Sequence, residues 1–209
     1  MKKIFSYNED IQKTAYLNWR VNPHDNCGNM EALAKAYFST SRYLMEIVLS
    51  DNTDKKADSL IFPILYSIDQ GIELYLKAII QEIETLTLAR INNYDTHDIN
   101  SLYNNMCAQM KKKEKITKGL QKHLEPVKTY IDELYSIIYV KKEDGKTKLN
   151  IDFARYPYNT EGESHFYVCN TNVVVDIPNL LSRLQEIENS LESLYALYEA
   201  EIDGLRSYR

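Results

Sequence analysis

The stretch "LYSIDQGIELYLKAIIQE" (residues 65–82) predicts a helix that is apolar on nearly all of its sides. With successive residues about 100° apart around the axis, one broad apolar face contains Leu65, Ile68, Ile72, Tyr75, Leu76 and Ile79. On the far side, Ser67, Gly71 and Ala78 form a strip of small residues that lets another helix approach closely. Because a helix that is apolar all round must be buried, we expect this one at the centre of a helical bundle.

Three charged residues, Asp69, Glu73 and Lys77, lie one turn apart along this helix. Lys77 can pair with Glu73, whereas Asp69 and Glu73 repel each other at the same spacing. Since an unpaired carboxylate at the edge of a core is costly, a cation or hydrogen-bond donor is expected from elsewhere in the chain. The candidates are Arg20, Arg42, His97 and Arg155. The stripe fits either a polar network that fixes the register of the helices or a site that binds a ligand.

Apolar residues spaced by three and four predict helices in most of the remaining chain. The helix that holds the opening stretch is expected at about residues 57–88, with Pro63 near its start. Further helices are expected at about 29–50, 97–112, 117–139 and 178–206. Asn29 is a candidate cap for the helix at 29–50, and Asp95 or Thr96 for the helix at 97–112.

The helices at 117–139 and 178–206 carry heptad-like apolar seams. The seams can pack on each other within one bundle, which is the default expectation, or one of them can form a dimer interface. Between these helices, residues 140–177 contain a turn signal, Asp144-Gly145, and a run rich in β-branched and aromatic residues, "HFYVCNTNVVVDIP". A small β-hairpin or an irregular excursion fits this segment.

The fold class that follows is all-α, with a single domain over residues 1–209 and a bundle of about five helices. The core of the bundle is expected at about residues 29–206, with an insertion at about 140–177 before the last helix.

Composition restricts the kind of protein. The net charge of −5 over 209 residues argues against a generally basic surface for nucleic acid. Cys27, Cys107 and Cys169 are far apart and form no CxxC pair, so neither a zinc ribbon nor a disulfide framework is predicted. "HDNC" (24–27) contains metal-ligand residue types, but a turn at a helix start is the preferred interpretation because no second ligand cluster is identifiable. We expect no metal and no cofactor.

The chain carries no predicted targeting or membrane segment. "MKKIFSYNED" (1–10) starts basic but reaches acids by residue 9, and no apolar segment follows it, unlike a signal peptide. No run approaches the roughly 18 apolar residues that a membrane span needs. We therefore expect a cytoplasmic protein without a membrane partner.

Several motifs together resemble a known family. "IDQGIELYLKAII" (68–80) resembles the "A-x-E-L-x-L-K-A" helix of HEPN domains, which are helical nucleotide-binding domains of prokaryotes. "THDINSLY" (96–103) is similar to the "H-D-L-x-x-L" start of their next helix, and "ARYPY" (154–158) looks like the "R-Y-P" that some members carry before the last helix. The order and spacing of the motifs also agree, and the resemblance covers roughly residues 30–205.

The resemblance implies a helical bundle that is often a homodimer, in toxin–antitoxin, antiviral or abortive-infection systems. Catalytic members cut RNA without a metal through an R-x(4–6)-H motif, usually with a polar residue after the arginine, and two such motifs meet across the dimer. This chain has one formal match, Arg90-x6-His97, but Ile91 follows the arginine and the motif spans a loop between two predicted helices. His97 also fits the "H-D-L" motif, as a helix-start residue near Glu73.

A ribonuclease reading assigns roles to this pair. His97 can act as a general base or acid near neutral pH. Arg90 can hold the scissile phosphate and stabilise its developing charge, and the ribose 2′-hydroxyl serves as nucleophile.

Two functions are therefore expected. The first is an RNA-directed effector in bacterial antiviral defence or a toxin–antitoxin system, acting as a homodimeric, metal-independent ribonuclease. The second is a non-catalytic module that binds a nucleotide or a partner protein, such as an antitoxin. It would use a polar groove formed by Asp69, Glu73, Lys77, His97, Asp98 and Arg155. A helical scaffold whose heptad seams mediate assembly is the remaining alternative.

Overall fold

The computed structural model describes residues 2–17, 21–88, 96–113, 118–141, 147–149, 151–156, 158, 162 and 173–207. Among these residues, five long helices form an all-α bundle, as the sequence predicts. They are α1 (Asn26–Ser50), α2 (Ala57–Thr87), α3 (Ile99–Lys113), α4 (Lys118–Ile138) and α6 (Ile177–Ser207). Each lies within about three residues of a predicted helix.

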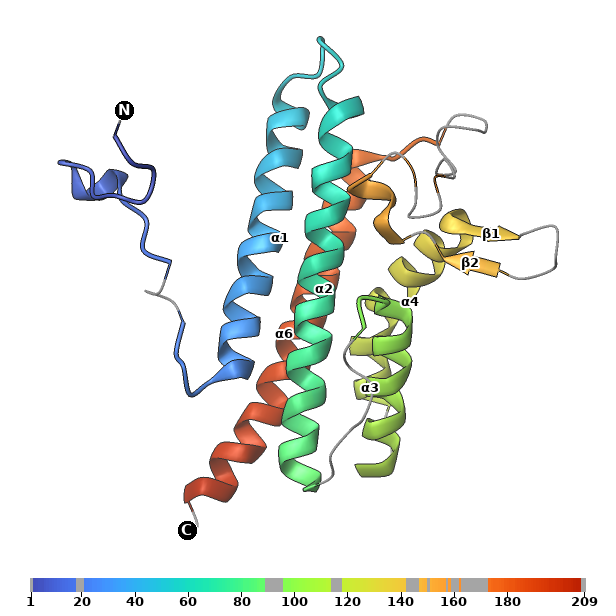
Figure 1. Cartoon of the computed structure of the whole chain (residues 1–209). Helices are drawn as coiled ribbons and strands as arrows, with labels where there is room; N and C mark the ends of the chain where they lie inside the picture. Colours follow the sequence, from blue (N-terminus) through green and yellow to red (C-terminus); the bar gives the residue numbers. More distant parts are fainter. Residues whose placement is uncertain are drawn as a thin grey trace.

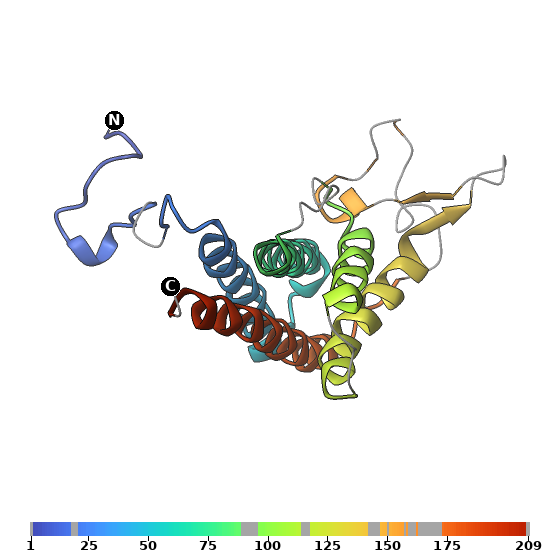
Figure 2. The ribbon, with the colours of Figure 1, turned by 90° about the horizontal axis from the view of Figure 1, so that it is seen from below.

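The helix of the opening stretch, α2, occupies the middle of the bundle (Figures 1 and 2). It packs against α1 on one side and α3 on the other, and α6 packs against α1, α2 and α4. The prediction of a central helix is confirmed by burial, since most residues from Ile64 to Ile83 are buried. Pro63 lies inside α2 rather than at its beginning.

The strip of small residues on α2 faces α1. Ser67, Gly71 and Ala78 are all buried. A Cβ atom at Gly71 would lie 2.3 Å from Cε1 of Phe38, far inside van der Waals contact. The ring of Phe38 therefore occupies the space that a side chain at position 71 would need, which explains why α1 and α2 pack so closely.

The two heptad-like seams pack within the chain, as expected by default. Helices α4 and α6 contact each other. Most seam residues are buried: Leu120, Leu124, Val127, Ile131 and Ile138 on α4, and Leu180, Leu184, Ile187, Leu191, Leu194 and Tyr198 on α6. Leu205, the last seam residue on α6, is exposed.

Two helix starts differ from the predicted caps. The side chain of Asp25 caps α1 by accepting a hydrogen bond from the Gly28 amide at 2.8 Å, so the helix begins three residues earlier than Asn29. Asn29 instead bonds the backbone of Asn22 through its side-chain amide. Helix α3 is capped by Asp98 rather than Thr96. Asp95, the other candidate, lies outside the described residues.

A β-hairpin begins the predicted insertion. Strands β1 (Tyr139–Lys141) and β2 (Thr147–Leu149) pair antiparallel, with Tyr139 opposite Leu149. A short 3-10 helix, η2 (Ile151–Ala154), follows and contacts α2. Asp144-Gly145 and most of the β-branched run lie outside the described residues. None of the described helices is both long enough and apolar enough to cross a membrane.

The segment before α1 stands away from the bundle (Figure 1). It contains one short 3-10 helix, η1 (Ile11–Lys13). Its large apolar side chains are exposed, among them Ile4, Phe5, Tyr7 and Ile11.

Candidate functional site

The charged stripe of α2 is organised around the carboxylate of Glu73, which is only 5% exposed. On the same helix, Nζ of Lys77 lies 2.9 Å from Oε1 of Glu73, and Nε2 of Gln70 donates to Oε2 at 3.4 Å. Both partners lie within one turn of Glu73, so α2 itself supplies two of the donors that this buried carboxylate needs.

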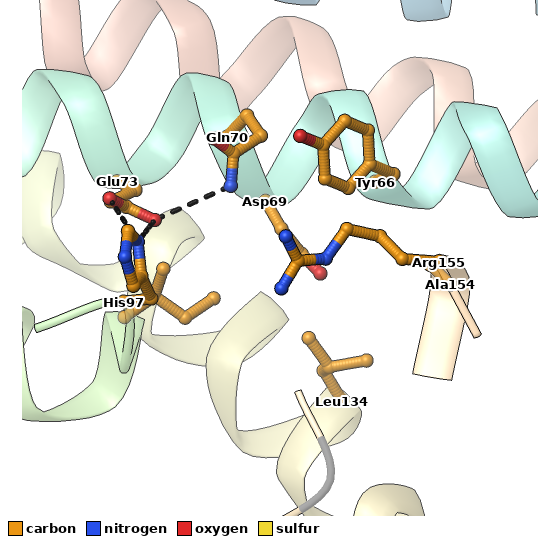
Figure 3. Close-up of a pocket in the computed structure, with 9 residues that line it drawn as sticks. Tyr66, Asp69, Gln70, Glu73, His97, Leu134, Ala154 and Arg155 are labelled. Carbon is orange, nitrogen blue, oxygen red and sulfur yellow. Dashed lines mark hydrogen bonds and ion pairs between the residues drawn. The ribbon is translucent and has the colours of Figure 1, made fainter. Parts of the chain in front are cut away.

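The third donor comes from the start of α3. Nδ1 of His97 lies 3.0 Å from Oε1 and 3.2 Å from Oε2 of Glu73 (Figure 3). Of the four cations considered for the stripe, His97 is the one that reaches Glu73 in the part of the chain that the structure describes. Arg42 pairs with Glu188 on α6 instead, and Arg20 lies outside the described residues.

The bond to Glu73 defines which nitrogen of His97 is available for chemistry. An ionised carboxylate can only accept hydrogen bonds, so the proton of a neutral imidazole lies on Nδ1. Nε2 is then the unprotonated nitrogen, and the ring is 75% exposed. A histidine oriented by a carboxylate at one nitrogen and accessible at the other is suited to accept or donate a proton.

Asp69, one turn before Glu73, is held by a residue of another helix. The hydroxyl of Tyr130 on α4 donates to Oδ1 of Asp69 at 2.8 Å. Burial, together with the neighbouring charge of Glu73, raises the pKa of Asp69 to about 7, although the bond from Tyr130 acts in the opposite direction. Asp69 therefore exchanges its proton near neutral pH, unlike an ordinary aspartate.

Asp98 has a structural role at the same end of α3. Its carboxylate accepts hydrogen bonds from the amides of Asn100 at 3.1 Å and Ser101 at 3.3 Å, as an N-cap does. The hydroxyl of Tyr135 on α4 also donates to it. Burial opposes ionisation of Asp98, but the bonds from Ser101 and Tyr135 outweigh this effect and lower its pKa. The carboxylate is used by the helix start and does not line the pocket described next.

Arg155 closes the site from the opposite side. It directly follows η2, and its guanidinium lies over the rings of Tyr66, 5.9 Å from the centroid, and Tyr156, at 5.5 Å. In Figure 3 its side chain extends along α2 toward Asp69 and Gln70. These two cation–π contacts restrict the direction of a side chain that is otherwise long and flexible.

These groups surround a cavity of about 70 Å³. It is lined by Tyr66, Asp69, Gln70, Glu73, His97, Ile99, Leu134, Ala154 and Arg155. The volume accommodates a few water molecules or one group of the size of a phosphate, but not a nucleobase. Carboxylates, an imidazole and a guanidinium share a small space, so proton exchange and recognition of an anionic oxygen are the chemistries that the cavity allows.

The structure brings together four of the predicted site residues, namely Asp69, Glu73, His97 and Arg155. Lys77 contributes indirectly, through Glu73. Arg90 lies outside the described residues, so its predicted pairing with His97 keeps the status of a prediction.

Sequence reasoning missed four polar residues that line the cavity or bond the predicted carboxylates. Tyr66 and Gln70 could have been found, because they lie three positions before Asp69 and Glu73 on the same helix. Tyr130 and Tyr135 carried no local signal. Their hydroxyls reach Asp69 and Asp98 only because of the way α4 packs, and that is a property of the tertiary structure.

The described residues include no group of three or more histidine, cysteine or acidic side chains arranged to hold a metal ion. In "HDNC", Asp25 caps α1 and Cys27 contacts Gln81 of α2. Burial and the nearby Glu82 raise the pKa of the Cys27 thiol, which keeps it protonated and unreactive.

Comparison of the chain with models of known families, with curated proteins and with solved structures gives no match. The likeness to HEPN domains therefore rests on the three motifs quoted above. In the structure, the first motif lies on α2, the second begins α3 and the third holds Arg155, and residues of all three line the same cavity.

Proposed function

We propose that this protein is a HEPN-like, RNA-directed effector and that the cavity beside Glu73 is a metal-independent ribonuclease site. The observation that carries the proposal is the bond between the buried Glu73 and Nδ1 of His97, which leaves Nε2 available on a residue that lines the same cavity as Arg155. The HEPN resemblance supplies the substrate class and the expected setting, a homodimer in antiviral defence or a toxin–antitoxin system.

The proposed reaction begins at the ribose. Nε2 of His97 takes the proton of the 2′-hydroxyl, and Glu73 stabilises the imidazolium that forms. The 2′ oxygen then attacks the adjacent phosphorus, and the bond from phosphorus to the 5′ oxygen breaks. The products are a 2′,3′-cyclic phosphate and a 5′-hydroxyl. The reaction needs no metal, because the ribose itself supplies the nucleophile and side chains transfer the protons.

Two further groups have roles in this step. Arg155 neutralises the charge that builds up on the non-bridging oxygens, and Arg90 is the second candidate for this role. Asp69, which carries a proton on part of the molecules near neutral pH, can supply the proton that the departing 5′ oxygen takes up. His97 and Asp69 would then act as base and acid of one reaction.

The test is cleavage of a single-stranded RNA by purified protein in the presence of EDTA. We expect His97→Ala to lower kcat/KM by at least about 100-fold, the lower range for loss of a general base. Arg155→Ala and Arg90→Ala test the two phosphate ligands separately. The matched control is His24→Ala, which removes an exposed histidine in the turn before α1. Cleavage that is unchanged in both His97→Ala and Arg90→Ala would overturn the catalytic assignment.

A non-catalytic nucleotide-binding module is the second candidate, and one observation favours it. Tyr156 is 55% exposed, and the centroid of its ring lies 5.5 Å from the guanidinium of Arg155, which lines the cavity. A cavity that takes a phosphate but not a base, next to an exposed aromatic ring, suits a nucleotide whose base stacks outside. If the wild type binds a nucleoside monophosphate, loses that binding in Tyr156→Ala and Arg155→Ala, and cuts no RNA, the module is the correct assignment.

A further inference from the structure

A second cavity, of about 330 Å³, adjoins the candidate site, since Leu134 lines both. Its walls come from α2, α4, η2 and the beginning of α6. Most of the lining side chains are apolar, among them Leu65, Leu134, Phe153, Val173, Val175 and Leu180. Apolar cavities of roughly 150 Å³ take up benzene, so this one has room for a larger apolar group.

The rim of this cavity is apolar although it is in contact with water. Val174 is 86% exposed and Ile137 is 45% exposed, and both line the cavity. Exposed apolar side chains around a hollow are typical of a ligand-binding site. Pockets for small molecules usually measure roughly 300–1,000 Å³, so the volume suits a small molecule rather than a helix of a partner protein.

Arg183 of α6 is the cation among the described residues that line this cavity. Its carboxylate partners are Glu133, 3.6 Å from Nη2, and Glu186, 4.0 Å from Nε. Both distances are too long for hydrogen bonds, and within the described part of the chain Nε has no hydrogen-bond partner. Glu133 and Glu186 are 70% and 57% exposed, so these ion pairs contribute little and an arriving anion can displace them.

Two other polar groups of the cavity already have partners. The hydroxyl of Tyr130 donates to Asp69, so the ring of Tyr130 lines this cavity while its hydroxyl is bonded to the candidate site. The carboxylate of Asp176 accepts a hydrogen bond from the amide of Asn179 at 3.1 Å and caps α6. The guanidinium of Arg183 is therefore the charged group that is best able to receive a ligand.

We propose that this cavity binds a small molecule with an apolar body and one carboxylate. The body would replace water along the apolar walls. The carboxylate would accept hydrogen bonds from Arg183, in the paired geometry typical of arginine with carboxylates. The proposed ribonuclease reaction uses neither Arg183 nor this cavity, so the inference goes beyond that function.

The test uses octanoate as the probe. Titration into isotope-labelled protein, followed through amide chemical shifts, gives a dissociation constant and shows which residues respond. Octanol and octylammonium are the comparison ligands, because they carry the same chain with a neutral or a cationic head. We expect octanoate to bind at least about 10-fold more tightly than octanol, the effect of a hydrogen bond to a charged group. The shifts should concentrate in α4 and at the beginning of α6.

Two substitutions should change this affinity in opposite directions. Arg183→Gln is expected to raise the dissociation constant of octanoate at least about 10-fold and to leave that of octanol unchanged. Glu133→Gln should lower the constant of octanoate by up to about 5-fold, because it removes the carboxylate that competes for Arg183. The matched control is Arg206→Gln, which removes an exposed arginine at the other end of α6 and should change nothing. Circular dichroism checks that all variants fold.

Arg155 of the smaller cavity is the other cation to be tested. Octanoate binding that is lost in Arg155→Ala but kept in Arg183→Gln would overturn the inference and place the carboxylate in the smaller cavity. Absence of binding, equal affinity for octanoate and octanol, or a preference for octylammonium would also overturn it. Since none of these measurements needs RNA, a protein that binds octanoate through Arg183 but cuts no RNA would overturn only the ribonuclease assignment.

Discussion

At the scale of single residues, Glu73 is the centre of the site. One carboxylate accepts from Gln70 and Lys77 on its own helix and from His97 at the start of the next. Asp69, one turn away, is held by Tyr130 and is easily protonated. Asp69, whose pKa is raised by burial, and His97, whose Nδ1 is bonded to Glu73, thus place a candidate acid and a candidate base in one cavity.

Glu73→Ala should destabilise the protein more than an exposed substitution does. The change leaves Lys77, whose side chain is 17% exposed, without its partner. Loss of one partner of a partly buried pair costs about 1–3 kcal/mol, and each kcal/mol lowers the melting midpoint of a chain of this size by roughly 2–4 °C. Thermal unfolding followed by circular dichroism measures the shift, with Glu125→Ala on the exposed face of α4 as control. A fall of less than about 1 °C would contradict the central position of Glu73.

Asp69 should make stability depend on pH. Its pKa in the folded protein is about 7, against an ordinary 3.8, so between these values the folded state binds more protons than the unfolded state. The stabilisation is complete below about pH 4 and is lost as the pH rises through about 7. Asp69→Asn, which keeps an acceptor for Tyr130, should flatten this dependence.

Urea unfolding of both proteins near pH 5 and near pH 8 measures the effect. The variant should gain up to about 3 kcal/mol over the wild type between the two conditions, since one pKa unit corresponds to about 1.4 kcal/mol. Equal pH slopes in the two proteins would show that Asp69 ionises as an ordinary aspartate.

At the scale of helices, the tight packing of α1 against α2 is the most extensive contact described in the bundle. The contact depends on Gly71, because the ring of Phe38 fills the place of its missing side chain. The same helix presents its charged stripe toward α3 and α4, so one surface of α2 packs tightly while another borders the cavity.

Gly71→Ala should destabilise the protein even though alanine favours helices. The added methyl group would lie 2.3 Å from the ring of Phe38, so either the ring or the helices must shift, at a cost of about 1–3 kcal/mol. Gly204→Ala on α6 is the control, since a Cβ atom there meets nothing within 4 Å. That change should stabilise the protein by up to about 1 kcal/mol. Denaturant unfolding compares the two, and stabilisation by both would disprove the close contact.

The helices and the central place of α2 could be predicted because they follow from the period of apolar residues along one segment. The cap of α1 could not, since Asp25 and Asn29 are both good capping residues within one turn. The stripe of α2 indicated that a partner was needed, and His97 was among four candidates. Tyr130 and Tyr135 could not be predicted, because the register of α4 against α2 and α3 has no signature in the local sequence.

At the scale of the whole molecule, burial is uneven. Helix α2 is enclosed by α1, α3 and α6, while residues 2–17 stand outside the bundle (Figure 2). The cavity lies between these extremes, on one side of α2, where α3, α4 and the segment after η2 meet. Because the cavity borders the buried helix α2, ionisable side chains of α2 lie at the edge of the core.

The rate of amide hydrogen exchange should rise from the buried helix α2 to the exposed residues 2–17. Amides in the buried part of α2, from Ile68 to Ile80, are expected to exchange most slowly, because they open only when the whole bundle unfolds. Amides of residues 2–17 should exchange fastest, since few of them are bonded within an element. Mass spectrometry of exchanged peptides checks both, and exchange of α2 as fast as that of α3 would contradict its central place.

The way the chain closes has a consequence for the order in which the protein folds. Helices α1 and α2 are consecutive and joined by a short connection, so their contact closes a small loop, whereas the pair Arg42–Glu188 joins residues 146 positions apart. We therefore expect the α1–α2 hairpin to nucleate folding and α6 to dock onto it afterwards. The bond of Tyr130 to Asp69 spans 61 positions, so the cavity is completed only once α4 has docked as well.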